Sequence, residues 1–567
     1  MQKHWQIANP APKDFIEKFP EYDPLVLQLL YNRNLTTQKQ IDEFFNPDYE
    51  TDLHDPFLFS DMEKAINRIL EAAEKKEKVA VYGDYDADGV TATVLLVKLL
   101  QKLGISGQVY IPDRRREGYG LNKKAIEWLA DKKVSLIITC DCGVSNYEEV
   151  EFAKKKNIDV IITDHHHIAH KLPQAYAVIC AKKENDHYPF KELTGVGVAF
   201  KLAQAIQLKL KRQIESGFEK RFLDLVAVGT IADVAPLLGE NRTLVKYGLS
   251  VLKNTPRLGL QSLMKRARIN SEELDTHSIG YFIVPRLNAA GRINHANNAY
   301  KLIIVQNKEE AEKYSRQLER ANRERQRIQE KIFKEVRNRV EKIPKKEKII
   351  FEADPSWPAG IVGIVASKVS EEYSRPVFLI EKDKKESIGS ARSVSNFNII
   401  EAIAQCSDIL LEYGGHSMAA GFTLENKNLE EFRKRLRDLA EKKLKNKDLI
   451  PSLKIDAEVK PFQINWKLYE QTEKFSPFGG GNEKPLFMLK GVRILDLMEV
   501  GLEKKHLKLK LADFNNRVWG AIGFNFSEWK NKLEVGNLID IVFELEKNEW
   551  NGKIELQLKL VDLKKSD

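Results

Sequence analysis

The chain has 567 residues, 43% hydrophobic and 31% charged, which is too long for one hydrophobic core and indicates a soluble protein of three or four domains. Its 91 Lys and Arg residues outnumber 82 Asp and Glu residues, and this mild basic excess fits a nucleic-acid partner without requiring one. The 4 cysteines form no CxxC pair and no apolar run could span a bilayer, which excludes a disulfide scaffold, a zinc finger and a membrane protein and indicates the cytoplasm.

Residues 1–75 are expected to form a short helical extension, whose first residues lack the apolar core of a signal peptide. From 76 to 304, short apolar strands alternate with helical patterns, which indicates a doubly wound α/β domain. Residues 305–343 are strongly charged, with apolar residues recurring every three or four positions, which predicts one long helix connecting two domains. A charged helix lying on the surface of one domain is the alternative.

A second α/β domain is expected at 344–447, opening with the strand KIIFEAD and followed by a basic linker. Residues 452–567 then change to β-type alternation with Gly and Asn turns, which predicts an OB-like β-barrel. The predicted fold class is therefore α/β, with two α/β domains joined by a long helix and a C-terminal OB-like barrel.

Three of the predicted buried strands end in acidic or acidic-plus-histidine clusters. In chain order these ends carry Asp84, Asp86 and Asp88, then Asp141, then Asp164, His165 and His166. Because the carboxyl ends of parallel strands line one crevice, we expect these side chains to lie close together. Carboxylates crowded in this way repel one another strongly unless cations hold them. The sequence therefore predicts a divalent metal site.

The first cluster, GDYDADG, contains three carboxylates at alternate positions, which on extended backbone would point to the same side. Hard oxygen ligands suit Mg²⁺ or Mn²⁺, and the added imidazoles shift the preference towards Mn²⁺. A calcium loop of the EF-hand type is disfavoured, because the glutamate that closes such a loop is missing. Asp141 taken alone could equally be a helix cap.

A fourth acidic segment, DLVAVGTIADVAPL, places Asp233 after an apolar helical run. A carboxylate buried there without a partner would be costly, so a metal or another cation should satisfy it. Ligands from four segments are enough for two metal ions about 3.5–4 Å apart, the arrangement used for in-line phosphoryl displacement. The residues therefore predict hydrolysis of a phosphoester.

The motifs GDYDADG, CDCGVSN, TDHHH and ADVAPL resemble the four motifs of the DHH phosphoesterase superfamily, and YGGHSMAAGF resembles the GGH motif of its associated second domain. PRLNAAGRINHA, SARS and FSPFGGGNEKPLF are similar to the RecJ branch, whose members are bacterial single-stranded-DNA-specific 5′→3′ exonucleases. The resemblance runs from about residue 60 to the C-terminus. It implies two Mn²⁺ or Mg²⁺ ions held by Asp84, Asp86, Asp88, Asp141, His165 and Asp233.

The resemblance also implies roles for other residues. Asp141, His166 and His416 are the implied catalytic residues, with His166 at the scissile phosphate or the metals and His416 reaching across from the second domain. The implied phosphate contacts are Arg114, Arg286, Arg292, Ser390, Arg392, Gly414, Gly415 and His416. The implied activity is release of mononucleotides from the 5′ end of single-stranded DNA, in DNA repair and recombination. A monomer is expected, with single-strand-binding protein and a helicase as further candidate partners.

Aromatic residues of the expected barrel could stack on bases, although most aromatic residues of a small barrel belong to its core. The candidates are Phe514, Trp519, Phe524, Phe526 and Trp529. Two other functions are considered: a DHH phosphodiesterase for short RNA, cyclic dinucleotides or pyrophosphate, and a non-catalytic DNA-binding relative. The long helix and the barrel argue against the first, and the presence of all four acidic segments argues against the second.

Overall fold

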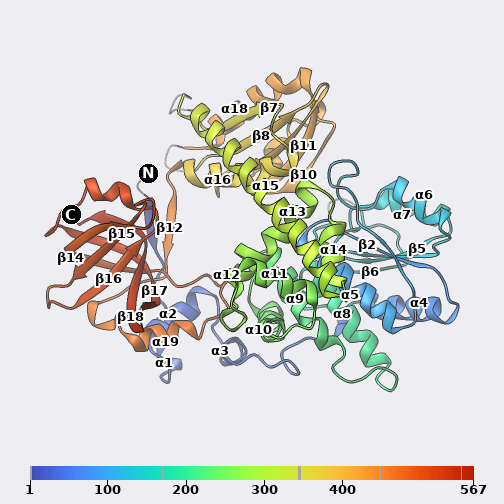
Figure 1. Cartoon of the computed structure of the whole chain (residues 1–567), viewed down its shortest axis with the longest axis horizontal. Helices are drawn as coiled ribbons and strands as arrows, with labels where there is room; N and C mark the ends of the chain where they lie inside the picture. Colours follow the sequence, from blue (N-terminus) through green and yellow to red (C-terminus); the bar gives the residue numbers. More distant parts are fainter. Residues whose placement is uncertain (1–2, 169–170, 343–346, 446–448, 551, 567) are drawn as a thin grey trace. The chain divides into compact units, whose positions relative to one another are not determined.

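The computed structural model describes residues 3–168, 171–342, 347–445, 449–550 and 552–566 (Figure 1). The chain divides into a larger unit, residues 48–449, and a smaller unit built from residues 1–47 together with 450–567. The extension expected at 1–75 is thus shared between the two units. Among the described residues, none of the helices combines the length and the apolar character needed to cross a bilayer.

The first α/β domain of the larger unit contains a parallel sheet of order β3-β2-β4-β5-β6. Its strands are β2 Val79–Gly83, β3 Gln108–Tyr110, β4 Leu136–Cys140, β5 Asp159–Thr163 and β6 Ala177–Ile179. The flanking helices are α4 Met62–Glu74, α5 Ala87–Lys102, α6 Lys123–Asp131 and α7 Tyr147–Lys155. Alternate residues of β2 enter different cores, because Val79 and Val81 pack with α4 and α5, whereas Ala80 and Tyr82 pack with α6 and α7. Both faces of the sheet are therefore covered, as a parallel sheet requires.

After β6 the described chain is helical up to residue 304, which corrects the expected alternation of strands and helices over that stretch. The helices are α8 Gly195–Lys209, α9 Leu223–Ala232, α10 Gly239–Lys253, α11 Leu258–Ala267, α12 Thr276–Ser278, α13 Val284–Ile293 and α14 Asn297–Ile304, with a π-helical turn, η4, at Ile279–Ile283. Apolar runs of 10 to 15 residues such as α9 and α8 are long enough to be buried helices, and periodicity alone does not separate these from buried strands.

The expected long helix is confirmed as α15, Lys308–Val340, with 33 residues. Asn307 caps its start by accepting a hydrogen bond from the backbone N–H of Glu310. Its first half packs on α11, α13 and α14, and its second half packs on α16 of the second domain. Spanning about 50 Å at 1.5 Å per residue, α15 shares both hydrophobic cores instead of lying on one surface.

The second α/β domain is built on a five-stranded sheet of order β10-β11-β9-β8-β7. Only β7 and β8 are parallel neighbours in this sheet. The strands are β7 Ile350–Asp354, β8 Val377–Lys382, β9 Glu386–Arg392, β10 Glu412–His416 and β11 Ala419–Glu425, and the helices are α16 Ala359–Tyr373, α17 Ile399–Ala404 and α18 Leu429–Lys443.

The smaller unit contains a barrel, closed where β14 pairs with both β15 and β17. Its strand order is β14-β15-β16-β18-β17, with β16 and β18 parallel, which is the order of an OB barrel. The strands are β12 Ser452–Ile455, β13 Ala457–Glu458, β14 Phe487–Val500, β15 His506–Ala512, β16 Val518–Gly523, β17 Leu538–Trp550 and β18 Lys553–Lys565, with α19 at Trp466–Glu473. The predicted fold class is confirmed in all three of its parts.

The N-terminal residues of the smaller unit are not purely helical as expected, because β1, His4–Ile7, pairs in parallel with β12. Three helices follow, α1 Lys13–Lys18, α2 Pro24–Asn32 and α3 Gln38–Phe45. The buried guanidinium of Arg33 donates to Asn482 Oδ1 at 2.7 Å and to the Glu483 carbonyl at 2.6 Å, and lies over the ring of Phe475. The FSPFGGGNEKPLF segment therefore anchors the N-terminal helices.

Candidate metal centre

The GDYDADG segment carries its three carboxylates across a strand-to-helix turn. Asp84 directly follows β2, Asp86 caps α5 by accepting from the N–H of Gly89 at 3.0 Å, and Asp88 lies in the first turn of α5. The expected extended backbone with alternating side chains is therefore wrong at this point. The carboxylates converge instead because the chain turns from β2 into α5.

Asp88 is fixed by a second helix. Its two carboxylate oxygens accept the backbone N–H groups of Gly195 at 2.7 Å and of Val196 at 3.0 Å, at the start of α8. Free N–H groups at a helix N-terminus favour negative charge, so α8 fixes the orientation of this carboxylate and opposes the rise in its pKa that burial causes. Gly195 also lies against Asp141, because a Cβ at residue 195 would meet Asp141 Oδ1 at 2.6 Å.

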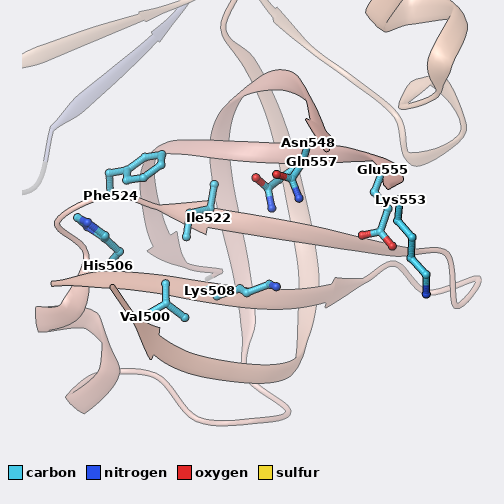
Figure 2. A pocket seen from close by; sticks show the side chains of 9 residues that line it. All are labelled: Val500, His506, Lys508, Ile522, Phe524, Asn548, Lys553, Glu555 and Gln557. Atoms are coloured by element: carbon cyan, nitrogen blue, oxygen red, sulfur yellow. The ribbon is translucent and has the colours of Figure 1, made fainter. Parts of the chain in front are cut away.

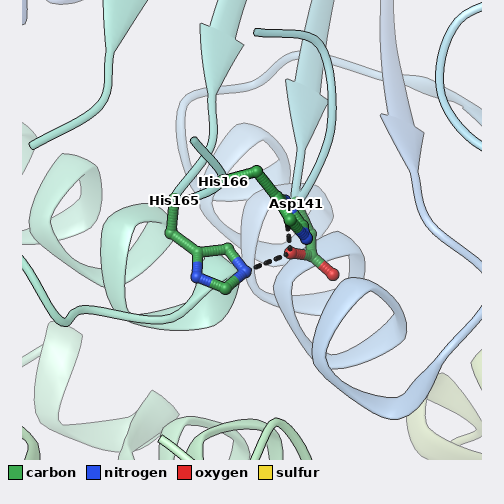
Figure 3. A group of neighbouring side chains, drawn as sticks. All are labelled: Asp141, His165 and His166. Carbon is green, nitrogen blue, oxygen red and sulfur yellow. Dashed lines mark ion pairs between the residues drawn. The ribbon is translucent and has the colours of Figure 1, made fainter. Parts of the chain in front are cut away.

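Asp141 directly follows β4 and has a left-handed backbone, with φ of +63°. The alternative that it caps a helix is wrong, since α7 begins at Tyr147 after Asn146. Only 2% of Asp141 is exposed, and its Oδ1 lies 3.0 Å from His165 Nε2 without accepting a directed hydrogen bond. Figure 3 shows His165 and His166 both facing this carboxylate. Two lone-pair atoms facing each other in this way suit a shared cation.

Asp164, which follows β5, is fully buried and is hydrogen-bonded within the protein. Its Oδ1 accepts the N–H groups of His165 and His166 and lies 2.8 Å from His166 Nδ1, while its Oδ2 accepts the N–H of Val144. Burial opposes ionisation of Asp164, but the hydrogen bond and charge of His166 lower the pKa of Asp164 to about 2. Burial likewise opposes the charge on His166, but the same partner raises the pKa of His166 to about 9. His166 is therefore oriented and protonated by Asp164.

Tyr119 completes the surroundings of His166. Its hydroxyl donates to the backbone carbonyl of Asp141 at 2.9 Å and lies 3.0 Å from His166 Nδ1. One hydroxyl thus connects the end of β4 to the histidine that follows β5.

The six expected metal ligands and His166 fall into three groups that share members. Within each group, the potential ligand atoms all lie within 4.8 Å of one another. The groups are Asp141, His165 and His166; Asp88, His165 and Asp233; and Asp84, Asp86 and Asp141. Asp233 caps the end of α9, and 33% of its side chain is exposed, so it is less buried than the sequence suggested. The structure therefore brings together residues from all four segments named by the motifs.

The electrostatics of this cluster fit divalent cations. Burial, followed by the charges of neighbouring aspartates, raises the pKa values of Asp84, Asp88 and Asp141 well above the usual range. Burial and the charge of Asp86 raise the pKa of Asp233 to about 7. Burial and the charge of His166 lower the pKa of His165 to about 3, so its imidazole is neutral and can offer a lone pair. Two buried oxygens, Asp84 Oδ1 and Asp141 Oδ1, accept no hydrogen bond.

The second domain contributes His416 at the end of β10, where its ring centroid is 6.0 Å from that of His167. The pKa of His416 is lowered by burial and then by the charges of His166 and His167. Gly415 has a φ of +143°, and a Cβ there would lie 2.4 Å from the Ala419 carbonyl, so the turn requires glycine. Gly414 faces open space. His416 thus lies beside the last residue of the HHH run.

Among the expected phosphate contacts, Arg392 is held by hydroxyl groups, donating to Ser367 Oγ at 2.9 Å and to Ser390 Oγ at 3.1 Å. Arg114 lies over the ring of Tyr85 at 4.9 Å. Among the described residues neither arginine forms an ion pair, although the charge of Arg114 acts on Asp84 and opposes the rise in the pKa of that carboxyl.

The sequence did not indicate whether Arg286 or Arg292 is free to contact a phosphate, but the packing of the two side chains distinguishes them. Arg286 Nε donates to Glu319 Oε2 at 2.7 Å, so an ion pair with α15 already neutralises it. Arg292 donates only to the backbone carbonyl of Gly360, at 3.0 Å. Arg292 is therefore the one whose charge is available to a ligand.

Sequence reasoning placed Asp164 in the acidic cluster but did not include it among the ligands or catalytic residues, and it gave no role to Tyr119 or His167. The TDHHH motif contains a signal for Asp164, because a carboxylate directly after a fully buried strand needs a partner. Tyr119 has no comparable signal, since its contact with His166 depends on how the loop before α6 folds back.

The barrel of the smaller unit has a hollow of about 450 Å³ on the face formed by β15, β16 and β18 (Figure 2). Its lining residues are Val500, His506, Lys508, Ile522, Phe524, Asn548, Lys553, Glu555 and Gln557. Phe524 is 49% exposed and contacts His506 edge-on, with ring centroids 5.1 Å apart. Trp519, also considered for stacking, is only 7% exposed and belongs to the core. This face offers an aromatic ring, that of Phe524 at one end, and two lysines, Lys508 and Lys553.

Comparison with known proteins agrees with these features. Residues 78–230 match the DHH family N-terminal domain, residues 346–442 the DHHA1 domain, and residues 455–562 the RecJ OB domain. The fold and the cluster of aspartates and histidines at its strand ends thus define a protein of the DHH class.

Individual relatives identify a narrower family within this class. The single-stranded-DNA-specific exonuclease RecJ of Bacillus subtilis is 38% identical over 98% of this chain and 70% of its own length. The protein of the same name from Haemophilus influenzae is 32% identical over 95% of this chain and 96% of its own. A crystal structure of RecJ in complex with Mn²⁺ from Thermus thermophilus superposes with a TM-score of 0.85 at 28% identity, covering 100% of this chain and 80% of that one. The chain therefore belongs to the RecJ family.

Proposed function

We propose that this chain is a metal-dependent exonuclease that degrades single-stranded DNA from 5′ to 3′, releases mononucleotides, and acts in DNA repair and recombination. The observation that carries the proposal is the three-group cluster in which Asp141 and His165 are each shared by two groups. Relatives named single-stranded-DNA-specific exonucleases, with 38% and 32% identity, support the substrate and the reaction.

We propose that Mn²⁺ or Mg²⁺ occupies this cluster, with Asp84, Asp86, Asp88, Asp141, His165 and Asp233 as ligands. RecJ of Thermus thermophilus has been solved with Mn²⁺ and with Mg²⁺, which supports both ions. Two such ions, when bound, would activate a water and hold the attacking and leaving oxygens of a phosphoester. The two orphaned carboxylate oxygens and the neutral imidazole of His165 supply the donors that these ions require.

The side chains around the cluster would position the DNA. Asp164 keeps the Nδ1 proton of His166 in place, so the opposite nitrogen can donate to an oxygen of the scissile phosphate. Arg392, Ser390 and Arg114 would hold a neighbouring phosphate, since neither arginine forms an ion pair among the described residues. His416 would approach the same strand from the second domain, on the backbone turn that Gly415 permits. Asp141 supports both tasks, because it joins the cluster and accepts from Tyr119 through its carbonyl.

The barrel would bind single-stranded DNA further along the strand. Stacking of a base on an exposed aromatic ring contributes about 1–3 kcal/mol and does not depend on base identity. Phe524 and Lys508, in the hollow of Figure 2, provide such a ring and a positive charge for the backbone.

The test is digestion of a single-stranded oligomer labelled at its 5′ or 3′ end, with Mn²⁺, Mg²⁺ or EDTA. We expect labelled mononucleotide at once from the 5′-labelled strand, a shortening ladder from the 3′-labelled strand, and no product in EDTA. Asp141→Ala should abolish hydrolysis and leave strand binding in EDTA intact. Exclusive cleavage of a dinucleotide, or wild-type turnover by Asp141→Ala, would contradict the proposal.

Further parts of the proposal concern location and assembly. The four cysteines, Cys140, Cys142, Cys180 and Cys406, are all buried free thiols, which supports a reducing cytoplasm. We propose a monomer that cooperates with single-strand-binding protein and a helicase. Sedimentation of the purified chain, alone and with each candidate partner, tests these assemblies directly.

A further inference from the structure

Four half-buried arginines of the larger unit form no ion pair among the residues that the structure describes, although the charges of Asp84 and Asp86 act on two of them, Arg114 and Arg292. Two of them, Arg114 and Arg392, have been described above with Tyr85 and with the serine hydroxyls. The third is Arg292, bonded to the carbonyl of Gly360, and the fourth is Arg325, on α15. Arginines kept away from water without carboxylates indicate that a ligand supplies the negative charge.

Arg325 has no carboxylate partner, and two amides hold it. Its Nη2 donates to Asn322 Oδ1 at 2.7 Å and its Nη1 donates to Gln329 Oε1 at 3.0 Å. Its Nε is buried and has no hydrogen-bond partner. The two amides fix the plane of the guanidinium but leave its charge and one donor unused.

Neighbouring arginines of the same helix behave differently. Arg323 donates to Glu319 at 2.8 Å, and Arg327 pairs with Glu324 at 2.7 Å. Arg316 of the same helix also lacks a carboxylate partner among the described residues and donates to the Glu312 carbonyl at 3.3 Å, but its side chain is exposed. Arg325 differs from all three because it is half-buried without an ion-pair partner among the described residues.

Arg292 follows Gly291 on α13, where a Cβ would lie 2.7 Å from the carbonyl of Tyr85, and α13 packs on α15, which carries Arg325. Burial lowers the pKa of Arg292 to about 9, with further lowering by the charges of Arg114 and Arg325, while the charge of Asp86 opposes the shift. Burial and then the charge of Arg286 lower the pKa of Arg325. The charges of Arg325 and Arg292 thus act on each other's surroundings, and this repulsion between like charges would be relieved by an anion bound between them.

We propose that Arg325, positioned by Asn322 and Gln329, binds a backbone phosphate of single-stranded DNA beyond the phosphate that lies at the metal centre. This inference rests on the proposed function for its ligand, and it assigns the connecting helix a direct part in holding the strand. Successive phosphates would contact Arg292 and then Arg325, so the contact needs a strand longer than a dinucleotide.

The first experiment measures binding in EDTA, where hydrolysis is absent, of a labelled 20-nucleotide oligothymidylate to the full chain at several salt concentrations. Each lost phosphate contact lowers the slope of log K against log salt by about 0.7 for single strands. We expect this loss for Arg325→Gln, together with an affinity about tenfold weaker, as for the loss of one charge-assisted contact. Arg327→Gln removes the same charge from an exposed pair on the same helix and should keep the wild-type slope.

A second variant keeps Arg325 but gives it an ion-pair partner within the protein. Gln329→Glu is isosteric and places a carboxylate where the amide oxygen lies 3.0 Å from Nη1, so an internal ion pair should compete with the phosphate. We expect the same loss of slope, without the risk that removal of Arg325 unfolds the helix. Gln326→Glu makes the same change of charge at an exposed position of α15 and serves as the matched control.

The second experiment compares rates in Mn²⁺ on the 20-nucleotide strand and on a 5′-phosphorylated dinucleotide. Arg325→Gln and Gln329→Glu should slow the long strand about tenfold and leave the dinucleotide at the wild-type rate, whereas a damaged fold would slow both. Wild-type slopes for both variants would overturn the role of Arg325, whatever the enzyme activity. Failure of the unmodified chain to cleave any strand would overturn the proposed function, and the binding slopes would still decide the contact.

Discussion

Gly195→Ala tests the geometry of the metal centre without replacing any of its expected ligands. A Cβ at residue 195 would lie 2.5 Å from Asp141 Cβ and 2.6 Å from Asp141 Oδ1, and ordinary contact begins near 3.4 Å. Asp141 must therefore move by about 0.9 Å, the difference between the 2.5 Å contact and 3.4 Å. The N–H of the same residue also fixes Asp88 at 2.7 Å, so carboxylates from two segments shift together.

A misplacement of about 1 Å costs about 100-fold in rate when positioning carries the reaction, and we expect a loss of that size. The alanine itself favours a helix over glycine by roughly 0.5–1 kcal/mol, so the variant should remain folded. Single-turnover digestion of a 5′-labelled strand in Mn²⁺ measures the rate of hydrolysis. Thermal unfolding with and without Mn²⁺ measures whether the ions still bind and stabilise the protein. Gly107→Ala is the control, because its nearest contact would be the Val79 carbonyl at 3.4 Å. A wild-type rate with a wild-type Mn²⁺ response would refute this account of the centre.

Three other predictions concern the ions, the barrel and the histidine. Without metal, a carboxyl with a raised pKa holds its proton more tightly in the folded than in the unfolded state. For Asp233 this lowers the free energy of unfolding as pH rises from 3.8 to about 7. Because Mn²⁺ would relieve this loss, it should raise the melting temperature more at pH 8 than at pH 5. Phe524→Ala should weaken binding of single-stranded DNA about 5- to 100-fold by fluorescence anisotropy, and Val518→Ala, at an exposed position of β16, the strand that ends just before Phe524, should not. Tyr119→Phe should lower turnover about 10- to 100-fold and alter its pH profile, because the hydroxyl touches His166; an unchanged profile would speak against that contact.

The strands, the long helix and the barrel could be predicted because each depends on a local pattern. Short apolar runs bounded by glycine and acidic residues gave β2, β4 and β5, and the period of three to four residues over a charged stretch gave α15. The helices that follow β6 were not foreseen, since apolar runs such as α9 fit a buried strand or a buried helix equally well until packing decides.

The composition of the site could be predicted, but its geometry could not. Asp84 and Asp88 were expected on one side of an extended segment, yet they meet across the turn into α5. Arg286 and Arg292 are equivalent in sequence, and only the position of Glu319 on α15 separates them. Such distinctions depend on contacts between segments far apart in the chain, which no local pattern contains.

The pairing of β1 with β12 has a consequence for synthesis of the chain. His4 pairs with Ser452, and Arg33 donates to Asn482, so the smaller unit cannot be completed until the segment that begins at β12 has left the ribosome. The residues between, 48–449, can already collapse around their own cores by then. The nascent protein would therefore acquire its hydrolytic half first, and a stalled or shortened product would expose the apolar face of its first three helices to chaperones and proteases.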